Sequence, residues 1–117
     1  MDDSILNSVK KILGIAPDYD AFDTDVIIHI NSVFSTLTQL GLGPNEGFMI
    51  EDASAVWEDF LLGDMRLNAI KTYVYLRVRV LFDPPTTGFV LTALQEQIKE
   101  LEWRMNVVRE ADSYGVN

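Results

Sequence analysis

The sequence predicts an all-α fold, a small helical bundle of about four main helices plus one short helix, with a long C-terminal helix. Apolar residues recur at steps of three and four along four segments, which is the period of a helix packed on one side. Glycine or proline follows the first three of these segments and stops each helix. The chain has 117 residues, enough for one domain. We place this domain at residues 1–110 and expect a tail at 111–117 that is flexible or ordered by a partner.

The first two helices are predicted at residues 4–13 and 24–40. Ser4 and Asp23 are residue types that cap helix N-termini, and Gly14 and Gly41 follow the last helical residues, where glycine is favoured. The apolar stripes are Ile5, Leu6, Val9, Ile12 and Leu13 in the first helix, and Val26, Ile27, Ile30, Val33, Phe34, Leu37 and Leu40 in the second. Ile28 lies outside the second stripe.

Residues 41–52 are predicted to form a loop, because they contain three glycines and a proline. The apolar sequence Phe48-Met49-Ile50 within this loop indicates a short extended segment or a hairpin. A short helix is predicted around residues 54–62, with its apolar side formed by Val56, Trp57, Phe60 and Leu61.

The helix predicted at residues 65–82, with Asp64 as its N-cap, is expected to be central, because its apolar arc covers more than half of its circumference. The arc combines two stripes, Leu67, Ile70, Val74, Val78 and Leu81, and Ala69, Tyr73, Leu76 and Val80. We expect Val74, Leu76 and Val78 to be largely buried, either in the subunit or in a ring of subunits. Arg77 lies between the stripes and requires a carboxylate partner if it is buried. Asp83-Pro84-Pro85 ends the helix.

The last helix is predicted at residues 87–110, capped by Thr86 or Thr87, and is expected to be the longest. Its apolar seam is Leu91, Leu94, Ile98, Leu101, Met105 and Val108, at the spacing of packed helices. Trp103 and Val107 face away from this seam. Either they cover a neighbouring part of their own domain, or they form a second packing face for another subunit, since tryptophan is enriched in interface hot spots.

The sequence indicates no catalytic, cofactor-binding or metal site. His29, the single histidine, lies at the edge of an apolar stripe without acids at ligand spacing, and is interpreted as a boundary residue. Asp18, Asp20, Asp23 and Asp25 resemble a calcium loop, but the glycine and glutamate that such a loop requires are missing. No glycine-rich phosphate loop follows a strand, and no serine or threonine has a base partner. We therefore expect a protein that is not an enzyme and binds no cofactor.

The net charge of −9 is unevenly distributed along the chain. Residues 46–64 carry six acids and no base, whereas residues 66–82 carry four bases and no acid. These blocks can pair within the fold or between identical subunits. Lysine and arginine supply most non-specific affinity for duplex DNA, so the overall acidity argues against a tight DNA binder. No apolar run approaches the roughly 18 residues of a membrane span, and no contact with a membrane is expected.

Three segments in a fixed order resemble the head–tail connector (adaptor, head-completion) proteins of long-tailed bacteriophages and prophages. They are the helix Lys71 to Arg79, the stop Phe82 to Pro85, and the helix Glu96 to Asn106. The resemblance is best over residues 64–106 and extends over residues 1–42. It implies a structural virion protein that forms a ring, typically a dodecamer, beneath the phage portal protein. The ring would extend the DNA channel and dock a stopper or tail-completion protein.

The resemblance also implies that genomic double-stranded DNA passes through the lumen without sequence-specific binding, and that the protein is in the host cytoplasm during assembly. Candidates for contacts between subunits are Ile28, Arg77, Trp103 and Val107. Candidates for docking of partner proteins are Phe48, Met49, Ile50, Tyr114 and Val116. The alternative is a non-virion helical interaction or regulatory module that binds a single protein partner. A helix-turn-helix DNA-binding regulator is disfavoured, because the four bases at 66–79 are spread over a mostly buried helix.

Overall fold

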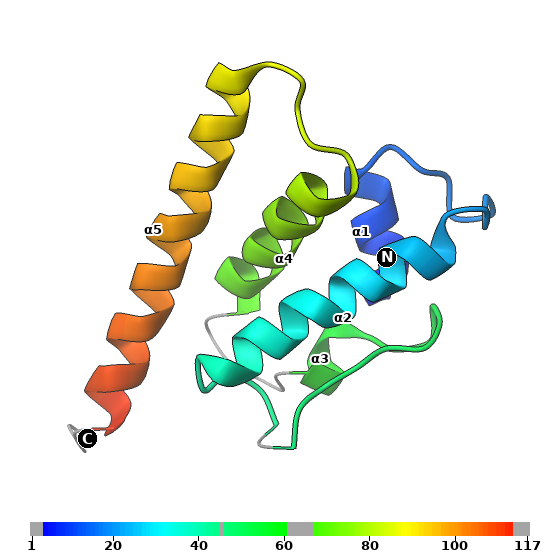
Figure 1. Ribbon diagram of the computed structural model, residues 1–117. Helices are drawn as coiled ribbons and strands as arrows, with labels where there is room; N and C mark the ends of the chain where they lie inside the picture. The colour runs from blue at the N-terminus through cyan, green and yellow to red at the C-terminus, as the bar shows by residue number, and fades with distance from the viewer. Residues whose placement is uncertain (1–3, 45, 61–66, 114–117) are drawn as a thin grey trace.

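The computed structural model describes residues 4–44, 46–60 and 67–113, and within these ranges it contains helices and no strand. The helices are α1 (Ile5–Ile12), α2 (Asp23–Gln39), α3 (Trp57–Phe60), α4 (Leu67–Phe82) and α5 (Gly88–Ser113). Figure 1 shows α4 between α5 on one side and α1 and α2 on the other. The predicted all-α fold, with a central fourth helix and a long last helix, is confirmed.

Helix α1 begins and ends as predicted. The Oγ atom of Ser4 accepts a hydrogen bond from the backbone N–H of Asn7 at 3.2 Å, and Gly14 adopts a φ of 80° after the last turn. Ile5, Leu6 and Val9 are buried. Ile12 was expected in the same stripe, but it is 51% exposed. It lies on the last turn of α1, at the edge of the core.

Asp23 does not cap α2, which corrects the prediction. The N-cap residue is Phe22, and Asp23 is the first helical residue. Its Oδ1 atom lies 2.7 Å from the Nζ atom of Lys10, which is fully buried and also donates to the carbonyl of Pro17 at 3.0 Å. A buried ammonium group requires a counter-charge. The carboxylate of Asp23 supplies this counter-charge instead of capping the helix.

Helix α4 supplies the centre of the core. Ile70, Tyr73, Val74 and Val78 are fully buried, as the two apolar stripes predicted, while Leu76 is only half-buried. Leu81 is 43% exposed and departs from the prediction. It lies in the last turn of α4, just before the chain turns away at Asp83. The predicted cap Asp64 lies outside the described residues, as does Leu61.

The loop before α3 is part of the core, and residues 48–50 form no hairpin. The ring of Phe34 on α2 lies 5.1 Å from that of Phe48 and 4.6 Å from that of Phe60, between centroids. The side chain of Asn31 fixes the backbone of Ile50, accepting from its N–H at 2.8 Å and donating to its carbonyl at 3.0 Å. One side-chain amide thus satisfies both polar groups that a second strand would otherwise pair.

Helix α5 is the longest helix, as predicted, and it packs on α4. Ile98 and Met105 of the predicted seam are buried against α4, and Leu101 is half-buried. The helix starts after Thr87, whose carbonyl accepts a hydrogen bond from the N–H of Leu91 at 3.1 Å. It continues to Ser113, so residues 111–113 of the predicted tail are helical. Tyr114 and Val116 lie outside the described residues.

Candidate functional site

A polar cluster joins α4 to α5 next to their apolar seam. The hydroxyl of Tyr73 donates to Oε2 of Glu102 at 2.6 Å, and Nη1 of Arg77 lies 3.1 Å from that hydroxyl and 3.3 Å from Oε2. Burial and the hydrogen bond to Glu102 raise the pKa of Tyr73 well above its ordinary range. Glu102 is therefore the carboxylate partner predicted for Arg77. A role of Arg77 between subunits stays a prediction, and its charge is already paired within the chain.

The outer face of α5, which we define as Phe89, Ala93, Glu96, Glu100 and Trp103, points away from α4. Trp103 is 67% exposed and Phe89 is 85% exposed. The exposure of Trp103 argues against the interpretation that it covers its own domain, and it favours the second packing face. Glu96 and Glu100 lie between the two aromatic residues, and Glu100 pairs with Arg104 at 2.6 Å. The side chain of Val107 lies outside the described part of the structure.

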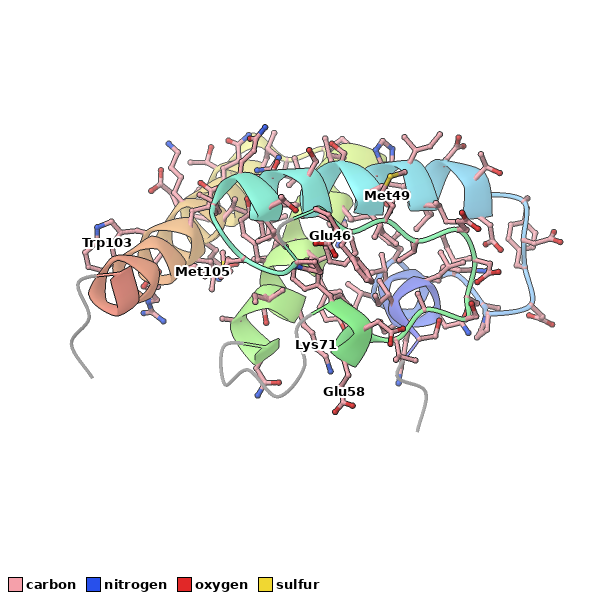
Figure 2. The ribbon with its side chains drawn as sticks, turned by 90° about the horizontal axis from the view of Figure 1, so that it is seen from below. Glu46, Met49, Glu58, Lys71, Trp103 and Met105 are labelled. Atoms are coloured by element: carbon pink, nitrogen blue, oxygen red, sulfur yellow. The ribbon has the colours of Figure 1, made fainter. Side chains whose placement is uncertain are left out.

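A groove of about 700 Å³ runs between α2 and the segment 46–49. Ile28, which is 59% exposed, and Met49, which is 73% exposed, supply its apolar surface together with the half-buried Phe48. Ser32 and Ser35 also line it. We call this feature the α2 groove. Figure 2 shows Met49 beside α2, whereas Trp103 lies at the far end of the molecule on α5.

The three docking candidates of the 41–52 loop have different environments. Ile50 is buried and Phe48 is half-buried against Phe34 and Phe60, because both contribute to the core. Of the three, Met49 alone has a largely exposed side chain. Loop composition could not separate them, since the difference arises from the contacts of Asn31 and Phe34 on a distant helix.

Several exposed apolar residues were missed by the sequence analysis. They are Tyr19, Phe22, Leu81, Phe89 and Val90. Phe89 could have been found, because it lies two heptads before Trp103 on the same face of α5. Phe22 contacts Phe82 with ring centroids 5.5 Å apart, and His29 contacts the same ring at 6.2 Å. His29 is thus the boundary residue that the sequence predicted.

The two charge blocks show no ion pair with each other within residues 46–60 and 67–82. Arg77 pairs with Glu102, and Lys71 lies over the ring of Trp57, with Nζ 5.8 Å from the centroid. Across the described residues, no three histidine, cysteine, aspartate or glutamate side chains are placed to hold a metal ion. In the same ranges, no helix has the length and hydropathy needed to cross a membrane.

No curated protein and no solved structure matches the chain. A family model described as phage connector protein matches residues 5–112. The match begins at the first residue of α1 and ends one residue before the end of α5, so it includes α1 to α4 and all of α5 except Ser113. The function of this family is structural, in the phage particle. The chain therefore belongs to the family of phage head–tail connector proteins.

Proposed function

We propose that this connector protein forms a ring beneath the phage portal, extends the DNA channel and joins the head to the stopper or tail. Membership of the connector family supports a structural role between other phage proteins. The ring, its position under the portal and its copy number of twelve follow from the resemblance described above. No enzymatic step is part of this proposal.

The observation that carries the proposal is the exposure of large apolar side chains on two separate faces. Trp103 and Phe89 lie on the outer face of α5, and Ile28 and Met49 lie on the α2 groove. Single exposed apolar residues are ordinary on protein surfaces. Two sets on different parts of the surface favour a subunit with two neighbours, because each copy in a ring contacts one copy on either side.

The test is the stoichiometry of the complex with portal rings of the same phage. We expect one closed ring of this protein per portal ring, measured by native mass spectrometry after co-sedimentation. A single bound copy would favour the alternative, a regulatory module with one protein partner.

Two variants test the role of the apolar faces in the same assay. Trp103→Ala and Ile28→Asp should remain helical but assemble at least about 30-fold less well, since truncation of a hot spot costs roughly 2 kcal/mol or more. Ile12→Ala is the matched control, because Ile12 is an exposed apolar residue on α1. Assembly of both variants at the level of the parent would contradict the role of these faces.

A further inference from the structure

The outer face of α5 and the exposed face of α2 have the same residue spacing. On α5 the exposed positions recur at steps of four and three, at Phe89, Ala93, Glu96, Glu100 and Trp103. On α2 the exposed positions opposite the core follow the same steps, at Ile28, Ser32, Ser35 and Gln39. Two helical stripes of this kind can pack along each other over several turns.

The side chains of the two faces complement each other when α5 of one copy runs antiparallel to α2 of the other. Trp103 at one end of the α5 face matches Ile28 and Met49 at one end of the α2 groove. If the helices run antiparallel with Trp103 at Ile28, Glu100 lies at Ser32 and Glu96 lies at Ser35. The serine hydroxyls can donate hydrogen bonds to these carboxylates, and their small size permits close approach.

With Trp103 kept at Ile28, the parallel direction is disfavoured by charge. Glu100 would then lie at Asp25 near the start of α2, and two carboxylates would face each other. The antiparallel direction also places Lys99 on the side of α2 where Glu46 lines the groove. The hydrogen bonds between Asn31 and Ile50 show that the 46–50 segment lies on that side.

We propose that the outer face of α5 of one subunit packs antiparallel in the α2 groove of the next copy of this chain. This inference rests on the proposed ring, and it names the two surfaces that form the contact between neighbours. Trp103 and Met49 lie on separate parts of the molecule (Figure 2), so each copy uses one surface toward each neighbour. Such a head-to-tail contact repeats from copy to copy, and it forms a closed ring when the rotation between neighbours is a whole fraction of a turn.

Disulfide trapping tests this contact directly, because the chain contains no cysteine. The double variants Ser32→Cys with Glu100→Cys, and Ser35→Cys with Glu96→Cys, should each link neighbouring copies when oxidised on portal rings. All four positions are exposed, so the fold should tolerate the substitutions. The direction control is Asp25→Cys with Glu100→Cys, a pair that meets when the helices run parallel with Trp103 at Ile28. The four single-cysteine variants S32C, S35C, E96C and E100C are the remaining controls.

We expect a ladder of linked species that extends beyond the dimer for both antiparallel pairs, and none for the direction control. Rings that assemble on the portal without linkage of either antiparallel pair would overturn this contact and leave the proposed ring intact. Linkage that stops at the dimer, or linkage of the control pair, would also overturn it. If the parent protein forms no ring on the portal, the proposed function fails together with this contact.

Discussion

At the scale of single residues, the buried side chain of Lys10 binds the first residue of α2, Asp23. Its ammonium group is fully buried and has two described partners, the carboxylate of Asp23 and the carbonyl of Pro17. Replacing Asp23 by alanine leaves the buried charge without a counter-charge, which costs roughly 3 kcal/mol or more of folding free energy. We expect this loss in urea denaturation followed by circular dichroism.

The matched control for this prediction is Asp25→Ala. Asp25 is also acidic and lies in the first turn of α2, but its side chain is exposed. Its replacement should change the unfolding free energy by no more than about 0.5 kcal/mol. Equal losses for the two variants would show that the macrodipole of α2, and not the buried lysine, accounts for the effect.

Tyr73 makes the link between α4 and α5 sensitive to alkaline pH. Its pKa is raised in the folded protein by burial and by Glu102, whereas in the unfolded chain it is near the ordinary value of about 10. Above that pH the unfolded chain releases the phenolic proton and the folded protein retains it, so stability falls as pH rises. Tyr73→Phe should weaken this decline, measured as urea midpoints between about pH 8 and pH 11. If stability declined equally in the parent and in Tyr73→Phe, Tyr73 would not be the group responsible for the decline.

The sequence predicted the kind of partner for some residues but not its identity. A carboxylate was expected for Arg77, yet the residue that supplies it, Glu102, lies 25 positions away on another helix. Asp23 is a good N-cap residue type, and only the fold reveals that Lys10 is buried beside it. The local sequence pattern indicates which residues form a helix or cap it. The pairs Arg77–Glu102 and Lys10–Asp23 depend instead on how the helices pack against each other.

At the scale of elements, α4 provides the most direct test of the core. Ile70 is fully buried, whereas Leu81 on the same helix is 43% exposed. Ile70→Ala should cost about 2–5 kcal/mol, the usual range for a buried aliphatic side chain. Leu81→Ala should cost clearly less, because much of its surface is already in water. Similar unfolding free energies for the two variants would show that α4 is not central.

Element types and order could be predicted from the sequence, because apolar period and stop residues act locally. Ser4 caps α1, Gly14 follows it in a left-handed conformation, and the prolines after Asp83 end α4. The conformation of residues 48–50 could not be predicted, because it depends on hydrogen bonds from Asn31 of α2. The position of Trp103 opposite the seam predicted that this side of α5 faces away from α4. The exposure of Phe89 on the same side was not predicted.

At the scale of the whole molecule, charge determines how the protein behaves toward DNA. Each chain carries a net charge of −9, so the proposed ring of such chains would repel the phosphate backbone on average. We expect no binding of free duplex DNA tighter than about 1 μM near physiological salt, measured by fluorescence anisotropy. A tighter complex that weakens steeply with salt would instead favour a DNA-binding regulator.

The central claim is that this protein joins heads to tails in the phage particle. Electron microscopy of particles from the phage lacking this one gene product tests it most directly. We predict heads without tails beside unattached tails, and tailed particles again when the parent chain is supplied from a plasmid. Tailed particles in normal number without the protein would contradict the claim.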